Sequence, residues 1–487
     1  MYLRKIFIAI SFFFFCSALS AQTLFKEKYR PQYHFTPDKN WTNDPNGLIY
    51  YNGEYHLFFQ HNPFGNQWGH MSWGHAVSSD LIRWKELAVA IPEEGNVGIF
   101  SGSAVMDPFF TSGFGKEKGK APMVAIYTAD VPNSNQSQHI AYSLDSGRTF
   151  TKFSGNPVLD LGQKDFRDPK VFWHQPTQKW VMSVMLPLEK KVQFYSSKTL
   201  KAWNLMSSFG PAGDTSGIWE CPDLFRVPVD GAPGKHKWVF MMSPSPYMQY
   251  FIGEFDGTKF INESNPSRIF RPDYGPDYYA AVTYNNLPAS FNPVSIGWVN
   301  NWNYAGAVPA GQWRGAMSIP RTLSVRKIGN DWILLQNPAD ELYTLQKKDT
   351  IITSDKLIKQ EDASFMAEWE WKTSTGSKEV SLGDKDLMIR FNPETREISV
   401  DRSLSKGFKN DAYQRLSVFK SVFPGELSEK LRFRLFVDES IVELFVGNGE
   451  LVFTSQVFSE KTLSTLQFQG SAEPFPVRIK DLGTYRD

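Results

Sequence analysis

Cysteine is nearly absent from this 487-residue chain, which contains only Cys16 and Cys221. Cys16 lies in an N-terminal segment that we expect to be removed, so Cys221 would remain alone and no intrachain disulfide would stabilise the fold. The scarcity of cysteine also excludes a structural zinc site built on paired thiolates. We therefore expect neither a metal nor another cofactor.

An excess of charge of one sign is also lacking, because 52 Lys and Arg residues balance 51 Asp and Glu residues to a formal net charge of +1. No basic tract is present, so nucleic acid is not an expected partner. Beyond the N-terminus, no apolar run is long enough to cross a bilayer, so no membrane span is expected. The sequence does not indicate an oligomeric state.

The N-terminus has the three parts of a secretory signal peptide. Arg4 and Lys5 supply the positive charge, Ile6 to Phe15 form a short apolar run, and Ala18 to Ala21 offer small residues for cleavage. This pattern predicts a signal peptide over residues 1–21. The mature protein is expected to be exported, either to the periplasm or to the extracellular space.

Long stretches with helical periodicity are missing, whereas short runs rich in Val, Ile, Tyr, Phe and Trp alternate with turns, which is typical of an all-β protein. A polar turn that ends in an aromatic residue recurs every 53 to 72 residues, at Trp84, Phe150, Trp203, Phe260 and Trp332. A repeat of this length fits one propeller blade of four strands. The pattern predicts a five-bladed β-propeller over residues 25–345.

The composition changes after the fifth repeat. Gln346 to Gln360 is polar and rich in Lys, and we expect it to be a linker or a transition between two domains. The alternating runs Leu431 to Val437 and Ile441 to Val446 follow, and the second ends at the hairpin signal Gly447 to Gly449. These features predict a β-sandwich over residues 361–487.

Three acidic residues stand in unusual settings. Asp44 lies in the turn Trp41 to Gly47, Asp168 precedes a proline, and Glu220 follows Trp219. Each of them could simply cap its own turn. However, their separations match two repeats and one repeat, and Ser101 and the segment Asp273 to Tyr279 fit the same spacing. Equivalent positions on successive blades face the propeller axis, so we expect these groups to converge at one mouth of the funnel.

Three carboxylates in one pocket cannot share one protonation state, since like charges and apolar walls separate their titrations. Asp44 lies between amides and is expected to stay ionised as the nucleophile. Glu220 lies between Trp219 and Cys221 and is expected to be protonated as the general acid. Asp168 is expected to stay charged, held by Arg167 or by a sugar hydroxyl.

The motifs of the chain resemble those of glycoside hydrolase family 32, the β-fructosidases. The resemblance extends in order over essentially the whole mature chain, including a sandwich signature at Val437 to Glu443. One departure is Thr42, where many members carry Met. The matching blocks in the catalytic part are Trp41–Gly47, Phe58–Gln60, Asn62–Pro63, Trp68–Gly69, Trp73–Ala76, Phe100–Ser103, Arg167–Pro169, Glu220–Asp223 and Trp313–Met317.

The resemblance implies a propeller followed by a sandwich and a retaining double displacement. Asp44 is then the nucleophile, Glu220 the acid/base and Asp168 the stabiliser of the transition state, with the carboxyl groups of Asp44 and Glu220 about 5–5.5 Å apart. The candidate substrate-binding residues are Asn43, Gln60, Trp68, Phe100, Ser101, Arg167, Tyr279, Trp302 and Trp313.

Two other groups of reactive side chains have simpler interpretations. His61, His70 and His75 are close in sequence, but His residues that alternate with Trp and Gly on strands more often pack or form hydrogen bonds than bind a metal. Cys221 has no paired His motif that would activate it as a nucleophile, so a packing or tuning role is favoured.

The function that the resemblance favours is an exo-acting β-fructosidase that removes terminal fructose from levan and inulin and also cleaves sucrose. An endo-acting fructanase or a fructosyltransferase of the same family remains an alternative. Outside the family, an Asp-box-like turn at Ser143 to Phe150 allows a sialidase-like hydrolase, although Arg167 is the only Arg in the blocks that carry the three carboxylates. A carbohydrate-binding protein without catalysis would be expected to lack one of the three carboxylates.

Overall fold

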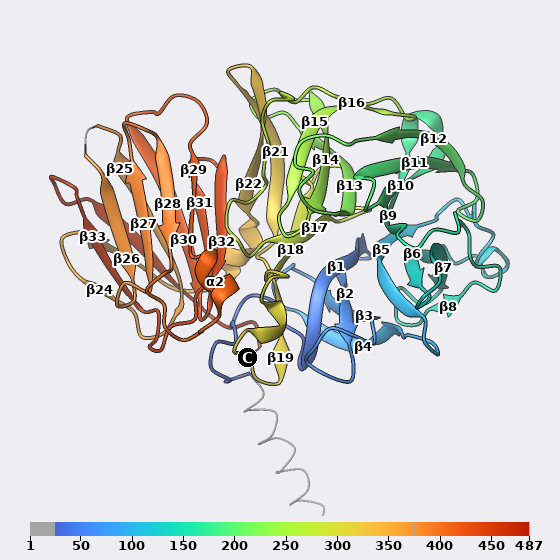
Figure 1. The fold of residues 1–487 in the computed structure, drawn as a ribbon, viewed down its shortest axis with the longest axis horizontal. Helices are drawn as coiled ribbons and strands as arrows, with labels where there is room; N and C mark the ends of the chain where they lie inside the picture. The colour runs from blue at the N-terminus through green and yellow to red at the C-terminus, as the bar shows by residue number, and fades with distance from the viewer. Residues whose placement is uncertain (1–24, 375, 487) are drawn as a thin grey trace, which may run out of the picture.

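The computed structural model describes residues 25–374 and 376–486, and it is built almost entirely of antiparallel β-sheets (Figure 1). The predicted signal peptide, residues 1–21, lies outside the described residues. Five sheets form one half of the molecule, and two six-stranded sheets form the other half. The all-β prediction, with a propeller followed by a sandwich, is confirmed.

The five sheets of the propeller follow one another along the chain. The first contains β1 (Asn40–Tyr51), β2 (Glu54–Asn62), β3 (Ser72–Ser78), β4 (Lys85–Ile91) and the late strand β19 (Trp313–Arg314). The second contains β5 (Gly98–Met106), β6 (Met123–Asp130), β7 (Gln136–Ser143) and β8 (Thr151–Lys152). The third contains β9 (Arg167–His174), β10 (Lys179–Leu186), β11 (Lys191–Ser197) and β12 (Asn204–Phe209).

The fourth sheet contains β13 (Trp219–Pro228), β14 (His236–Pro244), β15 (Gln249–Phe255) and β16 (Phe260–Asn262). The fifth contains β17 (Tyr279–Thr283), β18 (Val294–Val299), β20 (Ala316–Met317), β21 (Arg321–Ile328) and β22 (Asp331–Pro338). Short 3₁₀ turns lie at Lys116–Lys118, Gln175–Thr177, Ala305–Ala307 and Asp340–Leu345.

The first strands of the five sheets close a ring. Each of β1, β5, β9, β13 and β17 contacts the next in this order, and β17 contacts β1 again. The chain completes the ring where β19 of the fifth repeat pairs in parallel with β1, through Asn40 opposite Trp313 and Trp41 opposite Arg314. The inner strand of each sheet faces the axis of the ring, so polar residues on these strands can share one space.

The repeated aromatic residues mark the same place in every sheet. Trp84, Phe150 and Trp203 directly precede the fourth strands β4, β8 and β12, Phe260 begins β16, and Trp332 is the second residue of β22. The polar turns before them are closed by side chains. The Asp80 carboxylate, for example, accepts hydrogen bonds from the amides of Ile82 and Arg83 at 3.1 and 2.8 Å. The repeat in the sequence is therefore the turn between the third and the fourth strand of each blade.

The sandwich packs two sheets around a separate core. One sheet contains β23 (Gln346–Thr353), β25 (Ser364–Lys372), β30 (Lys430–Asp438), β31 (Ile441–Val446), β32 (Leu451–Gln456) and β34 (Pro476–Leu482). The other contains β24 (Ile358–Lys359), β26 (Lys378–Leu382), β27 (Leu387–Asn392), β28 (Glu397–Asp401), β29 (Val418–Val422) and β33 (Thr465–Gln469). A short helix, α2 (Asp411–Arg415), lies beside them. Among the described residues, no helix is long and apolar enough to cross a membrane.

The interpretation of residues 346–360 as a linker is wrong. The segment forms β23, which pairs with β34 at the edge of one sandwich sheet, and β24, which pairs with β33 at the edge of the other. Most side chains of β23 are exposed, and Ile352 packs against the core of the sandwich. The polar, Lys-rich composition that suggested a linker is also typical of edge strands, since charged side chains there prevent pairing with another chain.

Candidate active site

Four of the five positions that the sequence spacing predicted to converge lie on the inner strands of the ring. Of the fifth, the segment Asp273 to Tyr279, only Tyr279 does so, because Asp273 pairs with the buried Arg321. Asp44 is on β1, Ser101 on β5, Asp168 on β9 and Glu220 on β13, and Tyr279 begins β17. The axis of the propeller therefore brings together groups that are up to 235 residues apart in the chain, from Asp44 to Tyr279.

A β-bulge accompanies each of these positions. The ladder loses its register between Thr42 and Pro45 on β1 and between Glu220 and Asp223 on β13, and similar shifts occur at the corresponding places of the other three sheets. A bulge redirects a side chain out of the regular alternation of a strand. Proline follows Asp44 and Asp168 and also Cys221, and a bulge is one of the few places in a sheet that tolerates a residue without an amide proton.

Asp44 is almost completely buried and accepts hydrogen bonds at both oxygens. The Ser101 hydroxyl donates to Oδ2 at 2.6 Å, and the Asn43 amide donates to Oδ1 at 3.0 Å. The Cys221 thiol also approaches Oδ2 at 3.5 Å. Burial and the charge of Glu220 raise the pKa of Asp44 overall, and the hydrogen bonds from Ser101 and Asn43 offset part of this rise. The oriented carboxylate has the character that a nucleophile needs.

Asp168 has fewer donors than Asp44. Its Oδ2 accepts a hydrogen bond from the backbone amide of Cys221 at 2.9 Å, and its own amide donates to the Thr128 hydroxyl at 3.0 Å. Burial raises the pKa of Asp168 to about 7, against the lowering effect of the nearby Arg167. The charges of Glu220 and Asp44 raise it further.

Arg167, one of the two groups expected to hold Asp168, donates its hydrogen bonds to Glu220 instead and acts on Asp168 only through its nearby charge. Its Nε and Nη2 both donate to Oε1 of Glu220, at 3.2 and 3.0 Å, and its Nη1 donates to Asp165 at 2.8 Å. Arg167 and Asp168 are neighbours along the strand, but the guanidinium reaches across to β13 instead. The guanidinium of Arg167 thus links two blades, because it reaches from β9 to Glu220 on β13.

Tyr279 donates the remaining hydrogen bond to Glu220, from its hydroxyl to Oε2 at 2.5 Å. Burial raises the pKa of the Tyr279 phenol well above its usual value, so this hydroxyl keeps its proton and acts as a donor. Both oxygens of Glu220 are therefore acceptors here. These donors come from other blades, so Trp219 and Cys221 are not the only groups that surround its carboxyl group. The role of Glu220 as general acid stays a prediction.

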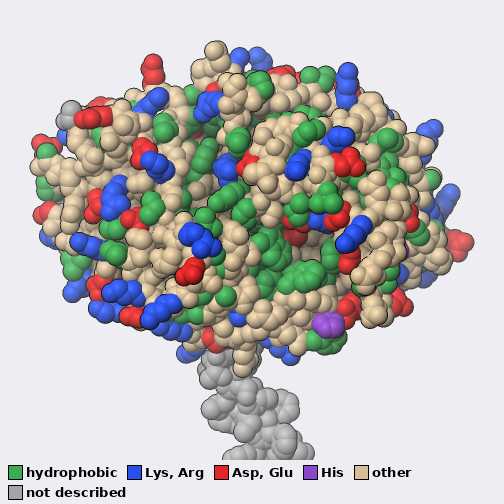
Figure 2. All heavy atoms as spheres, viewed as in Figure 1, with side chains coloured by type: hydrophobic (Ala, Val, Ile, Leu, Met, Phe, Trp, Pro, Cys, Tyr) green, Lys and Arg blue, Asp and Glu red, His purple; other side chains and the backbone are tan. Residues whose placement is uncertain are grey.

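A cavity of about 400 Å³ opens above these groups. All three carboxylates line it, and an aromatic wall surrounds them. Figure 2 shows a hollow on the propeller half of the molecule in which acidic side chains lie among hydrophobic ones. The predicted residues that line the cavity are Asn43, Asp44, Gln60, Trp68, Phe100, Ser101, Arg167, Asp168, Glu220 and Trp302.

Two of the predicted substrate-binding residues do not line this cavity. Tyr279 lies behind Glu220 and is buried. Trp313 is buried on β19, where its ring packs against the Arg30 guanidinium at 5.0 Å, because β19 is needed to close the ring against β1. Trp313 therefore belongs to the ring closure and not to the wall of the cavity.

Four residues that the sequence analysis did not identify also line the cavity, namely Met71, Gln136, Ile218 and Ser245. Gln136 has the clearest role. Its Oε1 accepts a hydrogen bond from Arg167 Nη1 at 3.1 Å and so helps to orient the Arg167 guanidinium. It begins β7, outside every motif, and nothing in its sequence neighbourhood marks it. Ile218 is different, because it directly precedes the Trp219–Glu220 pair and could have been included with that block.

The His residues and Cys221 have structural contacts. His61 Nδ1 lies 2.8 Å from the Trp41 carbonyl oxygen, His70 pairs with Glu93, and His75 stacks on Phe58. Within residues 25–374 and 376–486, no three His, Cys, Asp or Glu residues are grouped as metal ligands. Burial raises the pKa of the Cys221 thiol well above its usual value, which leaves it a poor nucleophile.

Comparisons with known proteins cover most of the chain and agree with one another. The pattern "Glycosyl hydrolases family 32 N-terminal domain" matches residues 34–338, and "Glycosyl hydrolases family 32 C terminal" matches residues 335–481. The levanase of Bacillus subtilis is 42% identical, over 96% of this chain and 72% of its own length. The extracellular exo-inulinase of Aspergillus niger is 39% identical, over 89% of this chain and 90% of its own. The crystal structure of exo-inulinase from Aspergillus awamori has a TM-score of 0.88 and 34% identity, over 95% of this chain and 99% of its own.

Proposed function

The chain belongs to glycosyl hydrolase family 32, and from this premise we propose that it is an exo-acting β-fructosidase. It removes terminal non-reducing β-D-fructofuranosyl residues from levan and inulin, and it also hydrolyses sucrose. The observation that carries the proposal is the single cavity lined by Asp44, Asp168 and Glu220. Glycoside hydrolysis with retention requires two carboxyl groups on either side of one bond, and this cavity holds such a pair with a third carboxyl group beside it.

We propose that Asp44 attacks the anomeric carbon of the fructosyl ring. The hydrogen bonds from Ser101 and Asn43 fix the direction of its carboxylate before the substrate binds. As the bond from carbon to the leaving oxygen breaks, Glu220 transfers a proton to that oxygen, and a fructosyl ester remains on Asp44. In the second step Glu220 takes a proton from water, which attacks the same carbon and releases fructose with its original configuration.

We assign the third carboxylate, Asp168, to the ring hydroxyls of the fructosyl group. Its Oδ2 is held by the Cys221 amide, which also brings it close to the Cys221 thiol at 3.8 Å. Hydrogen bonds from sugar hydroxyls to a carboxylate strengthen as positive charge develops on the ring, so they stabilise the transition state more than the ground state. Asn43, Gln60 and the Trp68 ring are in position to hold the remaining hydroxyls and the apolar face of the sugar.

The volume of the cavity supports exo action. A cavity of about 400 Å³ is at the small end of the range for ligand pockets, so it can enclose the terminal fructosyl unit of a polymer with little of the rest. In this proposal the terminal unit binds beside the carboxylates, and the remainder of the polymer stays at the rim.

We also propose the division of the chain and its destination. Residues 25–345 form the catalytic propeller, and the protein is exported by the signal peptide at residues 1–21. The pattern of the N-terminal sequence supports this, as does the relative from Aspergillus niger whose name includes "extracellular". Fractionation of producing cells, with a chain that lacks residues 1–21 as the control, tests export.

Product analysis tests the proposed activity. Purified protein is incubated separately with levan, inulin and sucrose, and the products are followed over time. The proposal predicts free fructose as the first and dominant product from both polymers, and glucose with fructose from sucrose. Release of oligosaccharides from levan or inulin at early times would contradict exo action, and growth of longer chains from sucrose would indicate a transferase.

A further inference from the structure

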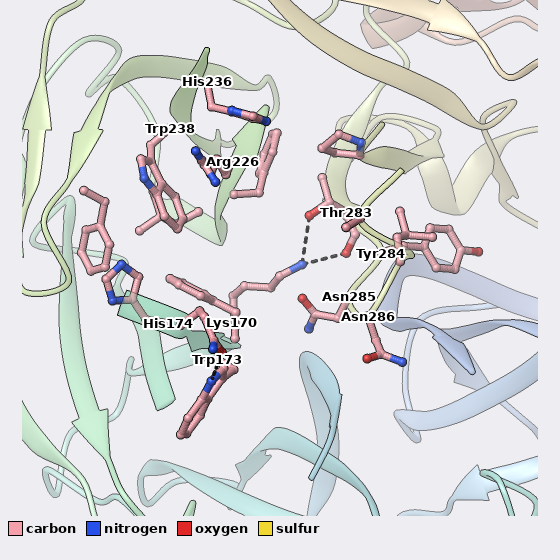
Figure 3. A pocket seen from close by; sticks show the side chains of 18 of the residues that line it. Lys170, Trp173, His174, Arg226, His236, Trp238, Thr283, Tyr284, Asn285 and Asn286 are labelled. Carbon is pink, nitrogen blue, oxygen red and sulfur yellow. Dashed lines mark hydrogen bonds between the residues drawn. The ribbon is translucent and has the colours of Figure 1, made fainter. Parts of the chain in front are cut away.

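A second and larger cavity, of about 710 Å³, lies on the propeller between the third, fourth and fifth sheets (Figure 3). We call it the far cavity and define it by Trp173, His174, Arg226, Trp238 and Asn286, which all line it. None of the contacts described for the active site involves these residues. The proposed function therefore leaves the cavity without a role.

The far cavity lies at the opposite end of the inner strands from the carboxylates. On β9, the chain passes from Asp168 in the active-site cavity to Trp173 in the far cavity. On β13, it passes in the same direction from Glu220 to Arg226. Since a strand advances about 3.3 Å per residue, the two cavities open at different mouths of the ring.

Lys170 separates the two cavities. Its ammonium group is buried, donates to the Thr283 carbonyl at 2.7 Å and pairs with Asp223 at 3.1 Å, as the dashed lines to Thr283 in Figure 3 indicate. The space between Lys170 and Asp168 is a chamber of about 10 Å³, which holds no more than one water. A molecule in the far cavity consequently cannot reach the carboxylates, so this cavity is not a second entrance to the catalytic centre.

The walls of the far cavity are largely aromatic. The rings of Phe172 and Trp238 lie 5.6 Å apart, and both are partly exposed, as is Trp173. Phe291, at the rim, is 45% exposed. In Figure 3, the labelled Trp173, His174 and Trp238 surround the hollow on one side, and Asn285 and Asn286 face it from the other. Exposed flat rings of this kind offer apolar faces for the C–H surface of a sugar ring.

Polar groups with free hydrogen-bonding capacity accompany the rings. Within the described residues, neither the Arg226 guanidinium nor the Trp238 indole nitrogen has a hydrogen-bond or ion-pair partner. The Asn286 amide nitrogen donates to the Tyr50 carbonyl, which leaves its oxygen available. An apolar wall with a few convergent polar groups is the usual composition of a small-molecule site.

The charges of the lining favour an uncharged ligand. Two cations, Lys170 and Arg226, are balanced by two acids, Glu254 and Asp256. Lys170 is already paired with Asp223 and Glu254 with Lys237, and burial lowers the pKa of His174, which keeps that ring neutral. A phosphorylated or acidic ligand would need a net positive lining, which is lacking here.

We propose that the far cavity is a second carbohydrate-binding site, which holds a segment of a neutral fructan without cleaving it. The ligand class rests on the proposed function, while the existence of the site rests on the cavity itself. The site would keep the enzyme on its polymer between successive cleavages, because two weak sites on one protein raise the effective concentration of chain ends at the other mouth.

Affinity electrophoresis tests the proposal, in native gels that contain levan or inulin. All proteins carry Asp44→Asn, so that the polymer is not consumed. The double variant Trp173→Ala/Trp238→Ala is compared with Trp203→Ala, which removes a partly exposed Trp from the same propeller outside the far cavity. We expect the double variant to lose at least threefold in retardation on one of the polymers, and the Trp203 variant to migrate like its parent.

Equal retardation of the double variant and its parent would overturn the proposal. So would Trp-dependent retardation by a sulfated polysaccharide but not by the neutral polymers. A third variant, Arg226→Ala, tests the site without removing a packed ring. Its exposed side chain has no ion pair to lose, so the fold should be unaffected, and we expect retardation to fall about twofold.

Sucrose hydrolysis separates this proposal from the proposed function. With Asp44 restored, the far-cavity variants should keep the kcat and KM of the native chain for sucrose. If the native chain releases no fructose from any substrate, the proposed function fails, whereas Trp-dependent retardation would still support the site. If hydrolysis is normal and retardation does not depend on Trp173 and Trp238, only the second site is refuted.

Discussion

At the scale of single residues, the three carboxylates differ in the groups that stabilise their charge. Asp44 accepts from two side-chain donors, Glu220 accepts from Arg167 and Tyr279, and Asp168 accepts from one backbone amide. A buried carboxylate with few donors is costly to ionise. Asp168 should therefore be the one whose charge lowers the stability of the free protein.

The variant Asp168→Asn tests this cost through its dependence on pH. The pKa of Asp168 is raised from 3.8 to about 7 in the folded chain, so the folded state holds a proton that the unfolded state has released as the pH rises from about 4 to 7. Stability of the native chain falls over this window. The variant does not titrate there, so its advantage should grow from near zero at pH 4 to the order of 2–4 kcal/mol at pH 8.

Thermal or denaturant unfolding of both proteins at several pH values measures this difference. The variant should also lose nearly all turnover, since it lacks the charge that stabilises the transition state. Unfolding curves that stay parallel between pH 4 and pH 8 would show that Asp168 is not the titrating group.

Tyr279 is a positioning residue for Glu220 and not a substrate contact. Its hydroxyl donates to Oε2 of Glu220 at 2.5 Å and so fixes the direction of this carboxyl group. Tyr279→Phe removes this donor and leaves the carboxyl group free to turn away from the leaving oxygen. We expect kcat to fall about tenfold or more with KM little changed, because Tyr279 does not line the cavity.

The kcat and KM for sucrose are measured on the native chain, on Tyr279→Phe and on Trp313→Phe. Trp313→Phe is the control, because Trp313 is buried away from the cavity. A general loss of the fold would lower the melting temperature and raise KM as well. An unchanged kcat would remove Tyr279 from this role.

At the scale of elements, the inner strands combine a bulge with a site residue in every sheet. On β5 the register shift lies between Ile99 and Gly102, next to Ser101. Gly102 is required because β6 passes so close that a Cβ at this position would lie 2.0 Å from the Ile126 carbonyl oxygen. The glycine thus allows the strand pair to approach while the bulge turns Ser101 toward Asp44.

Gly102→Ala should consequently destabilise the protein by about 1–3 kcal/mol, the usual cost of overpacking, and should also lower kcat because Ser101 moves. Gly65→Ala is the matched control, since its nearest neighbour would be 3.9 Å away. Unfolding and sucrose hydrolysis are measured on both. Equal stability of the two variants would mean that the close contact on β5 relaxes freely.

The elements also show what the sequence could and could not predict. The bulges are accompanied by a signal in the sequence, because Asp44, Asp168 and Cys221 each precede a proline and their spacing follows the repeat. The partner of Arg167 has no such signal, since it depends on how β9 and β13 face each other. Gln136 has no sequence signal either. The linker prediction fails at β23 because only one face of this strand packs against the sandwich, so that most of its side chains are exposed as in a linker.

At the scale of the whole molecule, buried ion pairs connect the propeller to the sandwich. Arg321 on β21 is completely buried and pairs with Glu443 of β31 at 2.5 Å and with Asp273 at 3.0 Å. His34 joins the same cluster through Asp438 and Glu443, at 2.7 and 3.0 Å. Arg321 and His34 of the propeller thus depend on acidic partners in the sandwich, so we expect the propeller and the sandwich to unfold together.

Arg321→Met should be severely destabilising, by about 3–5 kcal/mol, because it leaves two buried carboxylates without their shared cation. Arg326→Met is the control on the same strand. Arg326 also reaches the sandwich, at Glu450, but it is partly exposed and should cost at most about 1 kcal/mol. Denaturant unfolding measures both, and a similar small loss for the two variants would contradict the coupling of the halves.

In the proposed mechanism Asp44 forms the covalent bond to the sugar, and one measurement tests this directly. Glu220→Gln cannot supply the base for the second step, so an activated fructosyl donor should accumulate as an ester on the protein. Proteolysis and mass spectrometry then locate the added fructosyl unit. The mechanism predicts it on Asp44; a fructosyl unit on Asp168, or fructose released with inverted configuration and no adduct, would contradict it.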